Sequence, residues 1–464
     1  MNKIKIILLK ILPIFFWLIL WWLLSITINQ PLLLVSPIIV FNKIINIILS
    51  NSFITIIISS ISKITIGLFS ATLTGIIFAY ISNKNKYIKP LISSLILTIK
   101  SIPVASIIIL ILIWVSSANI SIIISYMMVL PIIYQNILIA FDNLDNKLIE
   151  MANIFNINKY IKYRYIYISQ LLPYFTSATI TSIGFSFKAG IAAEIIGLPT
   201  NSIGTSLYES KIFFDIPSLF AWTIIIIILS YLYETFFKLL IKIIAIKLKK
   251  INISKYPSNN INSISKTLDK DIIINNLTKI YDNKIVLNIS KLIIKANKTT
   301  TIVGKSGNGK TTLINILMKL TNYDKGQILN LPSSYSTLFQ EDRLVNNLDI
   351  YTNILLPHIN KESYKYITKP LIDTCLSKLD LIDSKDKLII ELSGGMKRRV
   401  ALIRAILANY QILFLDEPFK GLDIETKNMT INFINEYAKD KTIILITHDI
   451  LDAKLLNSTN IYNI

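Results

Sequence analysis

The pattern of hydrophobic and polar positions divides the chain into two regions. Apolar runs near the length of a bilayer-spanning helix occupy the first region, at about residues 11–28, 60–81, 91–115, 119–141, 171–195 and 218–240. Later in the chain, apolar runs are short, rich in β-branched residues and separated by polar turns, as in buried strands. The pattern therefore predicts an all-α, six-helix transmembrane domain over residues 1–250 and a soluble α/β domain over residues 271–464.

A polar segment separates the two predicted domains. Residues 251–270 lack apolar periodicity, are rich in Asn, Ser and Lys, and contain Pro257. This composition is typical of a flexible linker.

Charge and cysteine content narrow the possible classes of protein. The 464 residues are 53% hydrophobic and carry a net charge of +20, of which +13 lies within residues 1–250. The basic residues flank apolar runs and form no patch interleaved with aromatic residues, so we expect no nucleic-acid partner. The single cysteine, Cys375, excludes an intramolecular disulfide and suits a reducing compartment.

Basic residues also predict the orientation of the membrane helices. If six helices cross the bilayer, one side has only Lys43 and Lys211 in its connections. The other side has Lys3, Lys5, Lys10, Lys84, Lys86, Lys89, Lys147, Lys159, Lys162, Arg164, Lys238, Lys242, Lys247, Lys249 and Lys250. The positive-inside rule therefore predicts a multi-pass protein of the plasma membrane with both termini in the cytoplasm.

Two features of the first region suggest roles beyond spanning the bilayer. The connection 142–170 has helical apolar spacing, which predicts a short amphipathic helix at about 148–160 that either lies on the membrane or docks into a partner domain. Glu194 lies within the fifth apolar run, where an ionisable residue either lines a pathway or has a structural role. Gly190, Gly197 and Pro199 favour a broken or re-entrant segment there.

The soluble region contains a candidate phosphate-binding loop. The sequence GKSGNGKTT, from Gly304 to Thr312, lies between the strand-like TTTIV and the helical LINILMKL, and it fits the pattern G-x-x-x-x-G-K-[ST]. Its glycines let backbone N–H groups point at a phosphate, and the helix N-terminus adds partial positive charge. The alternative is a glycine-rich turn that binds nothing. The candidate phosphate ligands are Gly304, Ser306, Gly307, Gly309, Lys310, Thr311 and Thr312.

Polar residues follow several later strand-like runs. Asp416 and Glu417 end the run QILFLDEP, and His448 ends TIILITHD. Asp416 is expected to hold Mg²⁺, directly or through water, together with the Thr311 hydroxyl and Gln340. Glu417 is expected to orient or deprotonate an attacking water, since positioning and charge stabilisation carry most phosphoryl transfer.

Three residues of this group have weaker signals. Gln340, in STLFQEDRLV, is expected to report the γ-phosphate and Mg²⁺ to a neighbouring domain. His448 is expected to contact the γ-phosphate, and the alternative is a buried histidine at a strand end. Tyr281, 23 residues before Gly304, is a candidate for stacking on adenine. The predicted catalytic residues are thus Lys310, Glu417 and His448.

The sequence LSGGM, from Leu392 to Met396, resembles the signature motif of ATP-binding cassette (ABC) transporters. This resemblance implies a P-loop ATPase domain with a helical signature subdomain, and ATP and Mg²⁺ as cofactors. It also implies that Ser393, Gly394 and Gly395 act on ATP held by the opposite subunit, so that a second copy of the chain is needed. Arg398 stands where Gln is common, and Lys420–Gly421 where Ser–Ala is usual; we expect both departures to be tolerated.

The first region is similar to importer permeases of the nitrate/sulfonate/taurine family. The sequences KSIPVASIIILILIW, LIEMANIFN and KAGIAAEIIGLP carry this similarity. It implies that Glu150, Ala152 and Phe155 belong to a coupling helix that meets the ATPase domain. Asn156 stands where the motif has Gly, but Asn tolerates left-handed backbone.

The combined resemblance implies a fused importer half-transporter. It would move a small anionic or organic solute delivered by an extracytoplasmic solute-binding protein. The alternatives are an exporter half-transporter, which has the same order of domains, and a membrane-tethered ATPase without transport activity.

Overall fold

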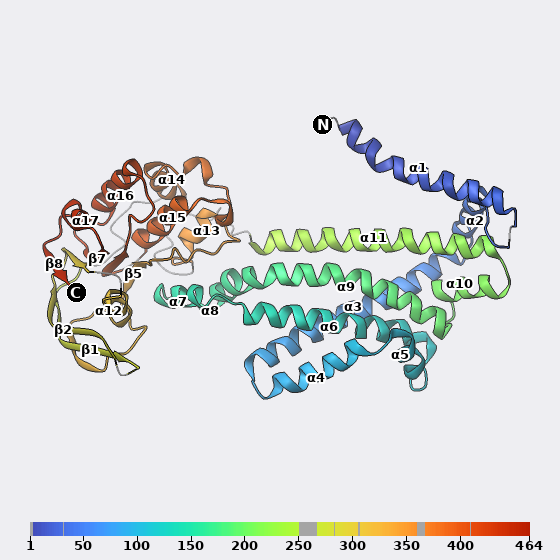
Figure 1. Ribbon diagram of the computed structural model, residues 1–464, viewed down its shortest axis with the longest axis horizontal. Coiled ribbons are helices and arrows are strands. Elements are labelled where there is room, and N and C mark those ends of the chain that lie inside the picture. Colours follow the sequence, from blue (N-terminus) through green and yellow to red (C-terminus); the bar gives the residue numbers. More distant parts are fainter. Residues whose placement is uncertain are drawn as a thin grey trace. The chain divides into compact units, whose positions relative to one another are not determined.

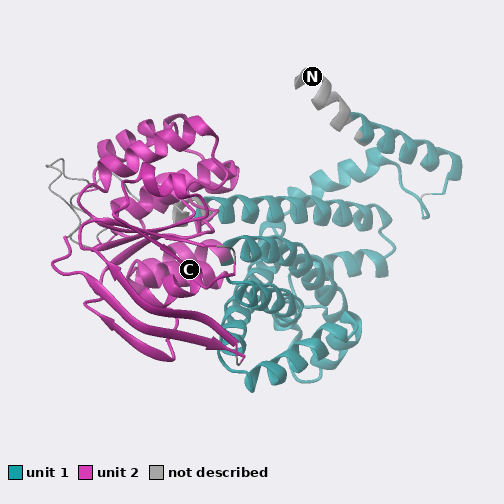
Figure 2. Cartoon of the chain, turned by 60° about the vertical axis from the view of Figure 1, so that its left-hand side comes forward, with its two compact units in different colours: residues 1–144, 171–247 teal, residues 145–170, 248–464 magenta. Residues whose placement is uncertain are grey.

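The computed structural model describes residues 3–30, 32–249, 267–282, 284–304, 307–359, 367–408 and 410–464, which form two compact units (Figure 2). Unit 1 comprises residues 1–144 and 171–247, and unit 2 comprises residues 145–170 and 248–464. The connection 145–170 thus packs with the soluble region although unit 1 flanks it on both sides in sequence. Most of the predicted linker, namely residues 251–266 of 251–270, lies outside the described residues.

Unit 1 consists of helices, which Figure 1 shows in chain order. The helices are α1 (Lys3–Ile28), α2 (Pro37–Ile48), α3 (Phe53–Lys84), α4 (Ile88–Ser101), α5 (Val104–Ile111), the short 3₁₀ helix η1 (Ser117–Asn119), α6 (Ile120–Asp142), α9 (Ile168–Gly197), α10 (Ile203–Ile212) and α11 (Ile216–Lys249). Its main core joins α3, α6, α9 and α11 through residues such as Ile64, Ile133, Phe187 and Tyr233.

Four helical stretches among the described residues are long and apolar enough to cross a membrane. They are Phe53–Lys84, Ser117–Asp142, Lys159–Gly197 and Ile216–Ile244. They contain four of the predicted runs, namely 60–81, 119–141, 171–195 and 218–240. The predicted run 11–28 lies in α1, which has 26 residues.

The predicted span over residues 91–115 is broken in the structure. The structure has α4 and α5 there, bent by 102° at the break between Ser101 and Val104. Proline explains the break, because Pro103 has no N–H to donate and forces extended backbone on Ile102, whose ψ is 132°. Among the described residues, the helices long and apolar enough to cross a membrane thus number four, or up to five if this bent pair is one span.

The buried carboxylate of Glu194 caps the start of α10. Its Oε2 accepts hydrogen bonds from Ser60 Oγ at 2.8 Å and from the Gly204 N–H at 3.2 Å. Ser60 Oγ accepts from the Ile203 N–H at 3.0 Å, and Ser202 Oγ accepts from the Thr205 N–H at 3.2 Å. Side chains thus bind three N–H groups that the first turn of a helix leaves unpaired.

The contacts around Glu194 also define where the fifth run breaks. Helix α9 continues through Gly190 and ends at Gly197, so the predicted break is present only after the run. Helix α10 approaches α9 closely, since a Cβ on Gly204 would lie 2.4 Å from Glu194 Cβ. The hydrogen bonds of Glu194 Oε2 to Ser60 and Gly204 favour the structural role among the two that the sequence left open.

Unit 2 contains two sheets. The strands β1 (Ile272–Tyr281), β2 (Lys284–Ile294) and β4 (Lys325–Leu329) form an antiparallel sheet in the order β2-β1-β4. A parallel sheet has the order β5-β6-β7-β3-β8, with β3 (Thr299–Val303), β5 (Tyr335–Leu338), β6 (Ile412–Asp416), β7 (Thr442–Thr447) and β8 (Asn460–Asn463). Every residue of β6 and β7 is buried, as expected of central strands in an α/β core.

Helices and short 3₁₀ segments complete unit 2. They are α12 (Lys310–Leu317), α13 (Ile350–Leu355), α14 (Lys369–Lys378), η5 (Ile382–Ser384), η6 (Ile389–Glu391), α15 (Gly394–Leu407), α16 (Ile424–Tyr437) and α17 (Ile450–Leu455). Helix α15 packs against α13 and β5. This packing places the helix that follows the LSGGM sequence beside the strand that precedes Gln340.

The connection 145–170 folds into two short helices and a π-helical turn. These are α7 (Asn146–Ile154), α8 (Lys159–Ile161) and η2 (Lys162–Tyr167), so the predicted single helix at about 148–160 is interrupted. Asn156 lies in the interruption with a φ of 48°, the left-handed conformation that Asn tolerates.

Candidate functional site

The phosphate loop lies between β3 and α12. Gly307 and Gly309 have φ of 91° and 80°, a conformation that favours glycine. A Cβ on Gly309 would lie 2.5 Å from the Val286 carbonyl oxygen, so the loop also needs glycine to pack on β2. Ser306, a predicted ligand, lies outside the described residues.

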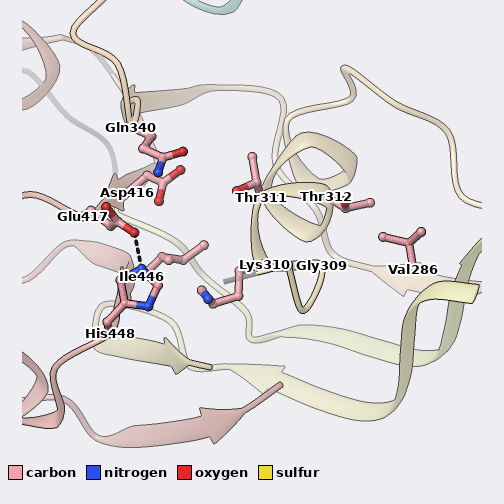
Figure 3. Close-up of a pocket in the computed structure, with 11 residues that line it drawn as sticks. Val286, Gly309, Lys310, Thr311, Thr312, Gln340, Asp416, Glu417, Ile446 and His448 are labelled. Carbon is pink, nitrogen blue, oxygen red and sulfur yellow. Dashed lines mark ion pairs between the residues drawn. The ribbon is translucent and has the colours of Figure 1, made fainter. Parts of the chain in front are cut away.

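A cavity of about 180 Å³ opens beside this loop (Figure 3). Its lining residues are Val286, Gly307, Gly309, Lys310, Thr311, Thr312, Gln340, Asp416, Glu417, Ile446 and His448. Parallel strands explain why these residues, distant in sequence, meet at one cavity. The carboxyl ends of parallel strands lie at one edge of the sheet. The phosphate loop follows β3, Gln340 follows β5, Asp416 ends β6 and His448 follows β7. The sequence reading missed the apolar wall formed by Val286 and Ile446, because no motif marks them.

Lys310 is held inside the loop. Its side chain is 6% exposed, and its Nζ donates a hydrogen bond to the Gly304 carbonyl oxygen at 2.6 Å. A lysine ammonium here points into the cavity as a positive charge that a phosphate can take as its partner. Figure 3 shows it opposite Glu417 and His448 across the cavity.

His448 and Glu417 form a pair at the cavity wall. The distance from His448 Nε2 to Glu417 Oε1 is 2.5 Å, and His448 Nδ1 lies 3.2 Å from the Gly304 carbonyl oxygen. Glu417 has a φ of 48°, while its N–H donates to the Ile446 carbonyl oxygen at 2.9 Å. This left-handed backbone costs about 1–3 kcal/mol in a non-glycine residue, and such strain is concentrated at functional sites.

The two adjacent carboxyl groups have opposite electrostatic environments. Burial and the neighbouring Glu417 raise the pKa of Asp416 to about 6. Burial alone would also raise the pKa of Glu417, but Lys420 and His448 outweigh it and hold that pKa below its usual value. Lys420 Nζ lies 3.3 Å from Glu417 Oε2. Glu417 therefore stays ionised at neutral pH, as an orienting or accepting carboxylate must.

The donor set suits Mg²⁺ bound together with phosphate. Thr311, Gln340 and Asp416, which all carry oxygen donors, line the main cavity and also a neighbouring cavity of about 130 Å³. Mg²⁺ prefers oxygen donors and is commonly held by one or two carboxylates plus phosphates. Within the described part of the chain, no group of three or more His, Cys, Asp or Glu is arranged to hold a metal ion by itself.

Five described residues that were predicted to bind nucleotide or to form the signature do not line this cavity: Tyr281, Gly304, Ser393, Gly394 and Gly395. Tyr281 ends β1, is largely exposed and lies under Lys279, whose Nζ is 5.0 Å from the ring centre. Ser393, Gly394 and Gly395 begin α15, where Ser393 Oγ accepts from the Met396 N–H at 3.3 Å. Ser393 and Gly394 are exposed.

The predicted coupling residues pack within unit 2. Glu150 Oε2 lies 3.0 Å from Arg343 Nη1, and Lys147 Nζ lies 2.6 Å from Glu341 Oε2. Ala152 and Phe155 are buried, and the guanidinium of Arg404 lies 5.4 Å from the centre of the Phe155 ring. Helix α7 therefore contacts the segment that directly follows Gln340.

Fold and site together define a class of protein. A parallel sheet with a phosphate loop after β3 and an Asp–Glu pair after β6 is the arrangement of a P-loop ATPase. Residues 287–420 match the family model described as ABC transporter, and residues 71–246 match that of the binding-protein-dependent transport system inner membrane component. The chain is therefore an ABC transporter protein in which a permease region is fused to an ABC ATPase region, and it is a multi-pass membrane protein.

Curated relatives resemble the ATPase region. The spermidine/putrescine import ATP-binding protein PotA of Acetivibrio thermocellus is 31% identical over 206 residues, which cover 41% of this chain and 58% of that protein. The methionine import ATP-binding protein MetN of Legionella pneumophila is 29% identical over 218 residues, covering 40% and 64%. The chain thus spans less than two thirds of either relative.

A solved dimeric bacterial ABC transporter cassette is 28% identical. The match covers 40% of this chain and 90% of the cassette, with a TM-score of 0.35.

Proposed function

We propose that the chain is an importer-type ABC half-transporter that uses ATP hydrolysis to move a small solute into the cytoplasm. The observation that carries the proposal is the packing of α7, which contains the importer-like segment, against the residues that follow Gln340 in the ATPase unit. The names of the relatives, which are import ATP-binding proteins, support the importer direction.

The residues of the cavity have different roles in ATP hydrolysis. Lys310 and the N–H groups of the loop and of the first turn of α12 bind the phosphates, because both present positive charge to the same wall. Thr311, Gln340 and Asp416 would hold Mg²⁺, which would neutralise charge on the phosphates. Glu417 orients the attacking water and accepts its proton, and His448 fixes the Glu417 carboxylate by the 2.5 Å contact.

The exposed position of Ser393 and Gly394 supports assembly with a second copy of the chain. These signature residues lie outside the cavity of their own subunit, and a homodimer would let each copy close the cavity of the other.

The permease region bears on the transported solute and on the orientation in the membrane. The permease resembles the nitrate/sulfonate/taurine type, so the solute is proposed to be a small anionic or organic molecule brought by an extracytoplasmic solute-binding protein. The basic residues favour cytoplasmic termini in the plasma membrane.

Reconstitution tests transport and its direction. The purified full chain would be placed in proteoliposomes with ATP on the cytoplasmic face, together with binding proteins loaded with taurine, nitrate, methionine or spermidine. We expect one loaded binding protein to stimulate hydrolysis and solute movement towards the ATP side. Extrusion of apolar dyes away from the ATP side, with no effect of any binding protein, would support an exporter. Hydrolysis without any solute movement would support a tethered ATPase.

The contact between Lys420 and Glu417 predicts a pH effect. Lys420→Met removes a positive charge that lowers the pKa of Glu417, so this pKa should rise. Less of Glu417 is then ionised at acidic pH, and the acid limb of the kcat/KM profile for ATP hydrolysis should move to higher pH. The equivalent change at exposed Lys439 should leave the limb in place. If the acid limb of Lys420→Met were unchanged or moved to lower pH, Lys420 would not be the group that lowers the pKa of Glu417.

A further inference from the structure

Arg398 is a buried cation that joins two segments of the candidate site. Its side chain is 6% exposed and projects from α15. Nη1 lies 3.0 Å from Asp342 Oδ1 and donates to the Phe339 carbonyl oxygen, with a longer contact of 3.4 Å to the Gln340 carbonyl oxygen. Nη2 donates to the carbonyl oxygens of Asp416 and, at 2.8 Å, Glu417.

These contacts use the fork of the guanidinium group. One terminal nitrogen faces the loop after β5, and the other faces the end of β6, so a single planar group spans both segments. A lysine offers one point charge, and a glutamine offers one neutral NH₂ on a shorter stem; neither can bond both segments in the same way. From the sequence alone, Arg398 was recognised only as an arginine at a position where Gln is common.

The bridged segments carry side chains of the main cavity. Gln340 lies in the first segment, and Asp416 and Glu417 in the second; all three line the cavity. Backbone placement decides where their side-chain atoms point, because the hydrogen bonds of Arg398 fix both backbones relative to one rigid group. Arg398, which does not line the cavity, thus constrains the spacing between the Gln340 and Asp416 side chains through their backbones.

We propose that Arg398 is a positioning residue that presets the separation of Gln340 from Asp416 and Glu417, and thereby the place where Mg²⁺ and nucleotide are held together. The inference rests on the proposed function as an ATPase and deepens it. Arg398 touches backbone and Asp342 rather than the cavity, so it acts through the residues it holds.

The same loop links Arg398 to α7. Arg404, also on α15, donates from Nη1 to the Arg343 carbonyl oxygen at 2.8 Å and from Nη2 to the Asp342 carbonyl oxygen at 2.9 Å. Arg343 in turn pairs with Glu150. A displacement of α7 thus reaches Asp342, and Arg398 ties Asp342 to the two carboxylate residues of the site.

The test separates positioning of the Mg²⁺ site from general folding. Arg398→Gln and Arg398→Lys would be made in the full chain, with Lys378→Gln as a control that removes an exposed charge on α14. Binding of a fluorescent ATP analogue would be measured in EDTA and across a Mg²⁺ titration, and kcat and KM for hydrolysis would be measured in parallel.

For Arg398→Gln we expect about a tenfold higher Mg²⁺ concentration for half-maximal nucleotide binding, as loss of outer supporting contacts weakens metal sites about 10–100-fold. We expect kcat to fall about 100-fold, since small misplacements cost that much. Binding in EDTA should stay within about twofold of wild type, and Arg398→Lys should be intermediate because it keeps charge but not the fork.

Two results would overturn the proposal. One is an unchanged Mg²⁺ requirement in both variants. The other is an equal loss of nucleotide binding with and without Mg²⁺, which indicates a structural role only. If Arg398→Gln fails to fold, the comparison of Arg398→Lys with Lys378→Gln decides. A wild-type chain that binds Mg²⁺–nucleotide without hydrolysing it would reject the ATPase function, while the binding titration would still test Arg398.

Discussion

Replacing Glu417 by Gln is expected to leave ATP binding near wild type and to slow hydrolysis by at least about 100-fold, the usual contribution of a positioned proton acceptor. The carboxylate lies at the wall of the cavity, stays ionised, and is fixed by His448 at 2.5 Å. The amide keeps the size of the side chain but cannot accept a proton from water. Single-turnover hydrolysis and equilibrium binding of ATP, measured on the same sample, check this.

A matched substitution distinguishes this effect from a change in charge alone. Glu436→Gln removes an exposed carboxylate that pairs with Lys378 at 2.5 Å, away from the cavity. It should hydrolyse ATP at close to the wild-type rate. If Glu417→Gln turned over ATP as fast as Glu436→Gln, the assignment of Glu417 as the catalytic carboxylate would be wrong.

Replacing Phe155 by Ala is expected to abolish most solute uptake while ATP binding is retained. The ring is 4% exposed and packs against the guanidinium of Arg404, within the ATPase unit. Truncation of a buried Phe to Ala typically costs about 3–5 kcal/mol, which is enough to undock a short helix. Uptake into proteoliposomes should fall more than about tenfold, whereas binding of a fluorescent ATP analogue should not change.

Two further variants sharpen the Phe155 result. Tyr160→Ala removes an exposed ring from α8 and should leave uptake intact, so it serves as the aromatic control. Glu150→Gln should have a smaller effect than Phe155→Ala, because Glu150 is half-exposed and exposed ion pairs contribute about 0–1 kcal/mol. If Phe155→Ala showed normal solute uptake, or if Tyr160→Ala lost as much uptake as Phe155→Ala, the proposed docking role of α7 would be wrong.

The phosphate loop and the carboxylate pair could be predicted because each is encoded in a short stretch. Gly307 and Gly309 need left-handed backbone, and Asp416 and Glu417 end a fully apolar run, so local physics identifies them. The apolar wall formed by Val286 and Ile446 could not be predicted in this way. These residues resemble any other strand residue, and only the pairing and packing of the strands bring them to the cavity.

In the membrane region, too, some features could be predicted from the sequence and others depend on the fold. Apolar length identified the regions that form long helices, because the bilayer sets that length. It did not reveal the 102° bend between α4 and α5, which depends on Pro103 and on the packing that accommodates two helical directions. Apolar length also could not indicate the role of Glu194. Its partner Ser60 is distant in sequence, and its partner Gly204 lies beyond a loop.

The sequence by itself determined that the chain has an apolar helical region, a phosphate loop and the resemblance to ABC transporters, since these depend on composition, local backbone demands and short motifs. Tertiary structure alone decided which residues of the ATPase unit α7 contacts and that Arg398 bridges the segments of Gln340 and Glu417. The reason is physical: a buried guanidinium takes its role from whichever carbonyl groups the fold brings within hydrogen-bonding distance, and no local pattern in the sequence specifies them.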